Sequence, residues 1–342
     1  MTETILDIRD LAIAYRVAQG EMRAVDGASL AVPAGTITGL VGESGCGKTT
    51  LARALTRVMP GNARLAGGQA LFAGRDLMTL PEAEMNRLRW REIAFVPQSA
   101  MNSLDPVYRV GTQLREVLVG RGGMDRRRAR ARAEELFGMV GIEPRRLGDY
   151  PHQFSGGMRQ RVAIALALAL GPRLVIADEP VTALDVIVQR QILDQLLELQ
   201  KGLGLSVILV THDISVVAYV CDRVAVMYAG QVVEAGDVRT VLTRPAHPYT
   251  MGLCNAFPHL DGARGVLTPI EGAPPDLLAP PPGCRFAPRC PFAVDACRRQ
   301  APPVQAIGGT HLAACHRIAE AEALRARAAR VETWAAMAET VA

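Results

Sequence analysis

The sequence predicts an α/β fold that is followed by a small, loop-rich extension. Three observations support this prediction. A glycine-rich loop lies between an apolar, β-branched run and a run with helical spacing. Two later apolar runs end in acidic residues or in histidine, at the strand ends where ligands bind in α/β sheets. After about residue 245 this pattern stops, and a proline-rich stretch leads to four closely grouped cysteines.

The composition is that of an ordinary globular protein, with 49% hydrophobic residues, 21% charged residues and a formal net charge of +4. A charge this small gives no reason to expect a nucleic-acid partner. The opening MTETILDIRD lacks the pattern of a signal peptide and predicts a first strand. The longest apolar run, 162–170, is far shorter than the roughly 20 residues of a membrane span. We therefore expect a cytoplasmic chain without disulfides that reaches a membrane only through partners.

The glycine-rich loop GLVGESGCGKTT matches the pattern G-x-x-x-x-G-K-[ST]. The run before it predicts a buried strand and the run after it predicts a helix, and this context makes a chance match unlikely. In such a loop the backbone N–H groups face phosphate oxygens, the lysine reaches the β- and γ-phosphates, and the threonine hydroxyl ligates Mg²⁺. The predicted nucleotide-binding residues are Gly42, Glu43, Ser44, Gly45, Cys46, Gly47, Lys48, Thr49 and Thr50.

A second glycine-opened helix start lies in YPHQFSGGMRQRVAIALAL, where Ser155, Gly156 and Gly157 precede a long helical run. Such a start also binds anions, yet one nucleotide needs only one site of this kind. We therefore expect two chains to pair head to tail. Each chain would then lend its second anion site to the γ-phosphate held by the other.

Each of two later strands brings candidate catalytic groups to its end. PRLVIADEP at 172–180 contains Asp178 and Glu179, and LSVILVTHD at 205–213 contains His212. The first acid can hold Mg²⁺, and the second can orient or deprotonate an attacking water. Acids at strand ends are common and a lone histidine is more often structural. Beside a phosphate loop, however, they predict a hydrolytic site in which His212 contacts the γ-phosphate.

These motifs, with TALD and TH, follow the order and spacing of ABC-type ATPases over about residues 1–250, and the sequence resembles that family. The resemblance implies a P-loop NTPase core over 1–245 that binds ATP. It also implies a β-rich N-terminal part and a helical subdomain inserted at about 100–165. The arginine-rich stretch 125–142 within that subdomain is better explained as a solvated helix face than as a nucleic-acid surface.

The resemblance assigns roles to three further residues. Gln98 in FVPQSAMNSLDP corresponds to the glutamine that acts at the catalytic and Mg²⁺ site and links it to a membrane partner. Asp185 in TALDV corresponds to the loop that contacts the second ATPase beside the nucleotide. Tyr15 corresponds to the aromatic on which adenine stacks, although an aromatic on an early strand can also belong to the core.

The forms FSGGMRQR, ALDVIVQRQIL and HPYT are similar to those of the oligopeptide/dipeptide importer branch, although the general family signature is LSGGQ. This similarity implies an ATP-hydrolysing subunit at the cytoplasmic face of the inner membrane. Its implied partners are two permease subunits, a second ATPase that is a related chain or a copy of itself, and a substrate-binding protein. Peptides are the expected cargo, with nickel or oligosaccharides as the alternative.

Two other classes of ATPase are less well supported. A DNA-repair or chromosome-organising ATPase would need a long insertion between Lys48 and Ser155, and the spacing leaves no room for it. A ribosome-associated ATPase would join two complete ATPase units in one chain, whereas only one is present.

The extension, 246–342, contains Cys284, Cys290, Cys297 and Cys315. Zinc sites usually use close C-x2–4-C pairs, which are absent, whereas four thiolates can hold a [4Fe–4S] cluster. Members of the importer branch carry such a cluster here, so we expect iron–sulfur first, zinc second and four unligated thiols third. We expect the metal to cross-link the extension, which is too small to fold on a core of its own. We expect ATP hydrolysis to be independent of this metal cross-link. Cys221 and Cys254 are expected to be buried apolar residues.

Overall fold

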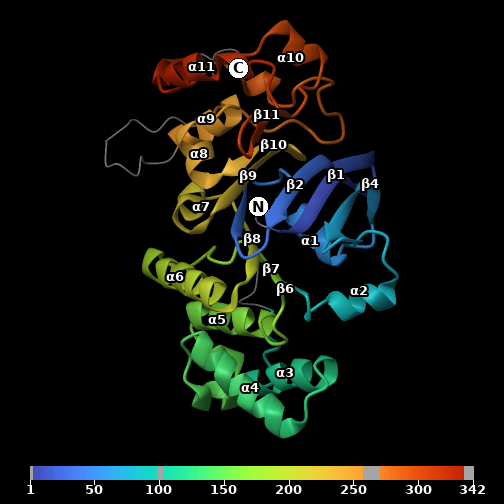
Figure 1. Ribbon diagram of the computed structural model, residues 1–342, viewed down its shortest axis with the longest axis vertical. Helices are drawn as coiled ribbons and strands as arrows, with labels where there is room; N and C mark the ends of the chain where they lie inside the picture. Colours follow the sequence, from blue (N-terminus) through green and yellow to red (C-terminus); the bar gives the residue numbers. More distant parts are fainter. Residues whose placement is uncertain (1–2, 99–102, 257–269, 335–342) are drawn as a thin grey trace. The chain divides into compact units, whose positions relative to one another are not determined.

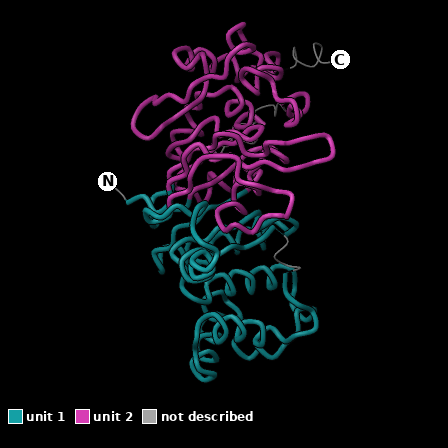
Figure 2. The backbone as a smooth tube through the Cα atoms, turned by 90° about the vertical axis from the view of Figure 1, so that its right-hand side faces the viewer, with its two compact units in different colours: residues 1–6, 32–37, 72–210 teal, residues 7–31, 38–71, 211–342 magenta. Residues whose placement is uncertain are grey.

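The computed structural model describes residues 3–98, 103–256 and 270–334 (Figure 1). The chain forms two compact units, which Figure 2 shows in different colours. Unit 1 comprises 1–6, 32–37 and 72–210, and unit 2 comprises 7–31, 38–71 and 211–342. The phosphate-loop segment and the extension beyond residue 245 therefore belong to the same unit, although they lie far apart in the sequence.

Unit 2 contains strands of two sheets. In the first sheet the order is β2-β1-β4, and in the second it is β11-β12-β10-β9-β3. β3 runs parallel to β9, and β10 runs antiparallel to both β9 and β12. The bounds are β1 Thr4–Val17, β2 Gly20–Pro33, β3 Ile37–Val41, β4 Ala63–Phe72, β9 Arg223–Tyr228, β10 Gln231–Asp237, β11 Gln305–Gly308 and β12 His311–Ala313.

Every residue of β3 is buried, as is all of β9 except Arg223. Such continuous apolar runs are typical of strands that are covered on both faces. The helices of this unit up to Asn255 are α1 Lys48–Thr56, α7 Ile214–Val220, α8 Val238–Thr243 and α9 Pro248–Asn255, the last of which opens the extension. Asp237 and His247 cap α8 and α9 by accepting a backbone N–H of the first turn, which satisfies donors that a helix start leaves unpaired.

The extension is tied to the rest of unit 2 by strand pairing and by aromatic packing. Its strand β12 continues the sheet at β10, where Glu234 lies opposite Ala313. Phe286 is 1% exposed, and its ring lies 5.2 Å from that of Tyr228 and 5.4 Å from that of Tyr249. The extension therefore has an apolar core, part of which it shares with β9 and α9. Its remaining elements are η5 Ala287–Arg289, α10 Asp295–Arg299, η6 Ile318–Glu320 and α11 Ala321–Ala328.

Unit 1 contains the parallel strands β6, β7 and β8, which are almost entirely buried. Helix α5 packs on β6 and on helix α6. The bounds are β5 Arg75–Asp76, α2 Glu82–Leu88, β6 Ile93–Val96, α5 Gly156–Ala167, β7 Leu174–Asp178, α6 Val186–Leu203 and β8 Ser206–Thr211.

The part of 100–165 that the structure describes, from residue 103 on, is mainly helical (green in Figure 1). Asp125 caps α4 by accepting the N–H of Arg128, and the arginine-rich face of α4 carries the exposed ion pair Arg130–Glu134 at 2.9 Å. This is the arrangement of a solvated helix face. The elements before α5 are α3 Val110–Glu116, η2 Val117–Arg121, α4 Arg126–Met139, η3 Pro144–Gly148 and η4 Pro151–Gln153. Within the described ranges, no helix is long and apolar enough to span a bilayer.

Candidate functional site

The predicted site residues fall into two groups, one in each unit. Unit 2 holds Tyr15, the phosphate loop Gly42 to Thr50, and His212. Unit 1 holds Gln98, Ser155, Gly156, Gly157, Asp178, Glu179 and Asp185.

The phosphate loop joins β3 to α1 and needs glycine at two positions. A side chain at Gly42 would place its Cβ 2.0 Å from the carbonyl oxygen of Met227, and one at Gly47 would place it 2.1 Å from that of Ala24. Gly47, the cap of α1, also has a φ of 102°, which residues with a side chain rarely adopt. The loop is therefore a tight cradle that closes directly onto the start of a helix.

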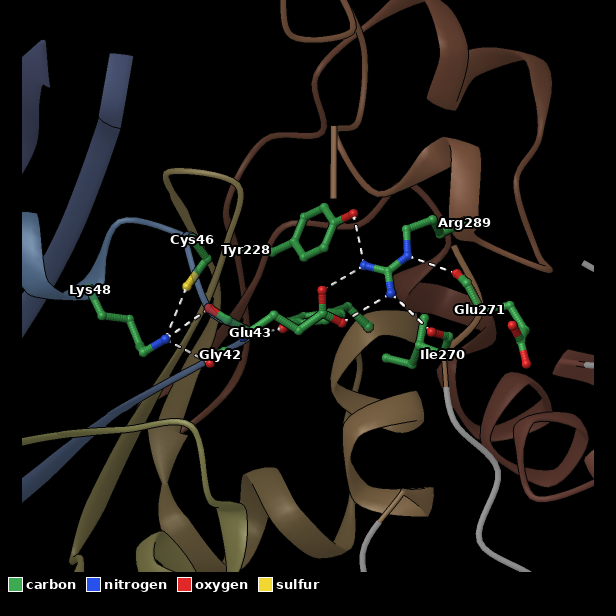
Figure 3. A network of polar contacts seen from close by, with 9 residues as sticks. Gly42, Glu43, Cys46, Lys48, Tyr228, Ile270, Glu271 and Arg289 are labelled. Carbon is green, nitrogen blue, oxygen red and sulfur yellow. Dashed lines mark hydrogen bonds and ion pairs between the residues drawn. The ribbon is translucent and has the colours of Figure 1, made fainter. Parts of the chain in front are cut away.

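Lys48 lies inside this cradle and is 5% exposed. Its Nζ donates to the carbonyl oxygens of Gly42 at 2.7 Å and of Glu43 at 2.8 Å, and it lies 3.6 Å from the sulfur of Cys46 (Figure 3). Burial raises the pKa of the Cys46 thiol against the opposing effect of Lys48. Cys46 therefore remains a neutral packing group, and its carbonyl oxygen accepts the N–H of Gly230 at 2.9 Å.

The other predicted residues of unit 2 lie as follows. The hydroxyl of Tyr15, on β1, lies 3.1 Å from that of Thr50 in the first turn of α1, so the structure brings these two together. Thr49 is half-buried next to Lys48. His212 is exposed just after β8, and the following residue, Asp213, caps α7.

In unit 1 the carboxylates Asp178 and Glu179 lie at the end of β7. Asp178 is fully buried, whereas Glu179 is partly exposed and has a φ of 48°. A positive φ in a residue with a long side chain is uncommon and often marks a functional site. The Glu179 Oε2 accepts hydrogen bonds from Gln98 Nε2 at 2.9 Å and from Thr182 Oγ1 at 3.0 Å. The structure thus brings Gln98 and Glu179 together. The sequence motifs do not single out Thr182 as a partner of Glu179. Its position three residues after Glu179, in the turn that follows β7, is the signal that points to it.

The residues of the predicted second anion site lie where α5 and α6 begin. Ser155 caps α5 by accepting the N–H of Met158, and Asp185 caps α6 by accepting the N–H of Val188. A Cβ at Gly157 would lie 2.5 Å from the Val188 side chain, so glycine allows the two helix starts to approach closely. Ser155 and Asp185 are therefore held on neighbouring helix N-termini.

Each group by itself offers chemistry that suits part of MgATP. Gly42 and Gly47 let the loop pack closely against the carbonyl oxygens of Met227 and Ala24, and Lys48 supplies an ammonium group within the loop. The hydroxyl of Thr49, the carboxylate of Asp178 and the amide of Gln98 offer the oxygen ligands that Mg²⁺ prefers.

The prediction of a [4Fe–4S] cluster in the extension is wrong. Cys284, Cys290, Cys297 and Cys315 do line one cavity, but its volume is about 10 Å³, which is space for no more than about one water. No group of three or more histidine, cysteine or acidic residues in the described part of the chain is arranged to hold a metal ion, so zinc fails as well.

The four thiols lie in an apolar setting. Burial raises the pKa of Cys284 and Cys290 and raises that of Cys315 to about 11. The extension is held together instead by aromatic packing and strand pairing. Of the other two cysteines, Cys221 is buried as expected, and Cys254 is partly exposed.

Comparison with known proteins finds two family matches along the chain. Residues 25–182 match the ABC transporter family, and residues 233–297 match the oligopeptide/dipeptide transporter C-terminal region. The oligopeptide transport ATP-binding protein OppD of Salmonella typhimurium is 45% identical over 92% of this chain and 94% of its own length. The dipeptide transport ATP-binding protein DppD of Bacillus subtilis is 43% identical over 92% and 94%.

Solved structures give the same result for the fold. A dimeric ATP-binding cassette in a post-hydrolysis state, bound to ADP and Pi, is 28% identical with a TM-score of 0.61. The match covers 68% of this chain and 99% of that chain. With relatives of this identity and coverage, the chain belongs to the ABC transporter family, among its oligopeptide and dipeptide transport ATP-binding proteins.

Proposed function

We propose that this chain is the ATP-hydrolysing subunit of an importer for dipeptides or oligopeptides. The observation that carries the proposal is the glycine cradle around the buried Lys48. It occurs in a chain that aligns over nearly its whole length with peptide transport ATP-binding proteins. ATP hydrolysis coupled to transport follows from membership of this family.

The residues of unit 2 are proposed to bind the nucleotide. The Nζ of Lys48 donates to carbonyl oxygens of the loop. Phosphate oxygens of a bound nucleotide can take the place of these acceptors without a movement of α1. Backbone N–H groups of the loop and the N-terminus of α1 add favourable interactions with the phosphates. Tyr15 is proposed to stack on adenine, and His212 is proposed to contact the γ-phosphate.

The residues of unit 1 are proposed to carry out hydrolysis. Glu179 acts as the general base that orients and deprotonates the attacking water, and its hydrogen bonds with Gln98 and Thr182 fix the carboxylate. Asp178, Gln98 and Thr49 would hold Mg²⁺, which neutralises charge on the phosphates when bound. Gln98 directly precedes residues 99–102, which lie outside the described part of the chain, and is proposed to couple the site to the membrane partner.

The second anion site is proposed to serve a partner ATPase. Ser155, Gly156 and Gly157 with Asp185 would contact the nucleotide of a related chain or of a second copy. Two permease subunits and a substrate-binding protein would complete the importer, with this chain peripheral at the cytoplasmic face of the inner membrane. We propose an ATPase domain over 1–245 with its helical subdomain at about 100–165, and the extension as a second domain over 246–342.

The experiment that tests this function compares the two lysines of the chain, Lys48 and Lys201. Lys48→Ala should weaken binding of MgATP by about 100-fold, because it removes charged contacts with the phosphates. Lys201→Ala, at the exposed end of α6, is the matched control and should bind like the wild type. Titration calorimetry on the purified full chain measures both. Normal binding by Lys48→Ala, or no binding by the wild type, would overturn the proposal.

A further inference from the structure

A buried arginine of the extension, Arg289, contacts the phosphate loop (Figure 3). Its guanidinium forms a two-pronged ion pair with Glu43, with Nη1 at 2.7 Å from Oε2 and Nη2 at 3.1 Å from Oε1. Arg289 is 5% exposed, and its partner carboxylate 26%. Glu43 lies between Gly42 and Ser44 in the loop that the proposed function assigns to ATP. A residue of the extension therefore holds a residue of the nucleotide site.

The guanidinium of Arg289 is fixed in a single orientation. Besides Glu43, it donates to the carbonyl oxygens of Ile270 at 3.0 Å and of Glu271 at 2.9 Å, and to the hydroxyl of Tyr228 at 3.3 Å. These contacts give an acceptor to all five N–H groups of an arginine. Burial alone lowers its pKa, but the hydrogen bonds with Glu43 and Tyr228 outweigh burial and the pKa is raised. Arg289 is therefore always charged.

Glu43 in turn connects this contact to the lysine of the loop. Its carbonyl oxygen accepts Lys48 Nζ at 2.8 Å, and its N–H donates to the hydroxyl of Tyr249 at 2.9 Å. Arg289 is thus linked to Lys48 through one intervening residue. All three polar groups of Glu43 are paired, two of them with residues that follow β9.

A second arginine of the extension supports the same loop indirectly. Arg285, four residues before Arg289, donates to the carbonyl oxygen of Ala229 and to the carboxylate of Asp26. The neighbouring Gly230 donates its N–H to the carbonyl oxygen of Cys46 at 2.9 Å. The extension therefore contacts the loop directly at Glu43 and supports the turn that contacts it at Cys46.

The charge of Glu43 makes this contact important for an anionic ligand. A carboxylate in a phosphate-binding loop repels a triphosphate, and the repulsion is strong where water is excluded. A Glu43 carboxylate without its own partner would also pair with the Lys48 ammonium and keep that ammonium from the phosphates. The ion pair with Arg289 prevents both, because it neutralises the carboxylate and holds it away from Lys48.

We propose that Arg289 is a positioning residue for nucleotide binding, so that the extension sets the ATP affinity of the phosphate loop by fixing and neutralising Glu43. The inference rests on the proposed function, because it takes ATP as the ligand of the loop. It assigns the extension a role at the nucleotide site that requires no metal.

The test is a double-mutant cycle on the full chain, read as the Kd for MgATP and as KM and kcat for hydrolysis. Arg289→Gln should raise Kd and KM about tenfold, a typical coupling for a contacting charged pair, and leave kcat nearly unchanged. In the Glu43→Gln background the same substitution should raise Kd less than about twofold, because no carboxylate remains to be neutralised. Arg289→Lys keeps the positive charge but cannot form the two-pronged ion pair. Its Kd should therefore lie between those of the wild type and of Arg289→Gln.

The matched control is Arg317→Gln, which removes a partly buried arginine of the extension that pairs with Glu320 and should leave Kd unchanged. The inference would be overturned if Arg289→Gln and Arg317→Gln raised Kd equally. It would also be overturned if Arg289→Gln raised Kd as much in the Glu43→Gln background as in the wild type. If Arg289→Gln unfolds, as seen by circular dichroism, Arg289→Lys in both backgrounds decides instead. A different result would refute the inference alone: the wild type binds MgATP, Lys48→Ala does not, and the Arg289 variants have the Kd of the wild type. The proposed function would then still stand.

Discussion

Tyr15 illustrates how one side chain can serve two purposes at this site. Its ring is proposed to stack on adenine, while its hydroxyl lies 3.1 Å from that of Thr50 at the start of α1. Stacking uses the face of the ring and the hydrogen bond uses its edge, so the two contributions can be separated by substitution.

Tyr15→Ala should raise the Kd for MgATP about tenfold, because base stacking on an aromatic contributes roughly 1–3 kcal/mol. Tyr15→Phe keeps the ring and should change Kd by less than about twofold. Fluorescence titration with an ATP analogue measures both. Equal losses in the two variants would assign the effect to the hydroxyl and Thr50, and no loss in Tyr15→Ala would show that the ring is only part of the core.

At the scale of the elements, the start of α9 depends on a histidine that must stay neutral. His247 is 1% exposed, and its Nδ1 accepts the N–H of Tyr249 at 3.1 Å, which a protonated nitrogen cannot do. Burial lowers the pKa of His247 from 6.5 to about 3. The unfolded chain therefore takes up this proton below about pH 6.5 and the folded chain does not. The contribution to stability is full above that pH and is lost as the pH falls toward 3.

His247→Asn should remove this dependence, because an asparagine can cap a helix but does not titrate. Between pH 7 and pH 4.5 the free energy of unfolding of the wild type should fall by on the order of 2 kcal/mol more than that of the variant. Urea denaturation at several pH values measures the difference. Glu234, which accepts the N–H of His247, is common to both proteins. Parallel pH profiles would contradict the prediction.

The elements differ in how far the sequence could predict them. β3, the phosphate loop and α1 were predictable because their signals are local: an apolar run, glycines and helical spacing. The grouping of the four cysteines around one cavity was predictable in outline, but a volume of about 10 Å³ results from packing, and spacing alone cannot give it. The pairing of Glu43 with Arg289 joins positions 246 apart. Only the packing of the extension on β9 and α9 determines it.

For the molecule as a whole, the proposed roles are divided between the two units. Unit 2 combines the phosphate loop with the extension, and the two are in direct contact through the ion pair of Glu43 with Arg289. Unit 1 contains the proposed base and the residues proposed to form the second anion site. On these proposals, ATP turnover requires residues of both units, whereas binding relies mainly on unit 2.

The most direct test of the central claim is the rate of ATP hydrolysis by purified Glu179→Gln beside that of the wild type, with MgATP binding measured on the same samples. The glutamine keeps the shape of the side chain and can still pair with Gln98, but it cannot take a proton from water. The account predicts that turnover falls at least about 100-fold, within the range of general-base contributions, while Kd for MgATP stays close to that of the wild type. Near-normal turnover by Glu179→Gln would contradict it.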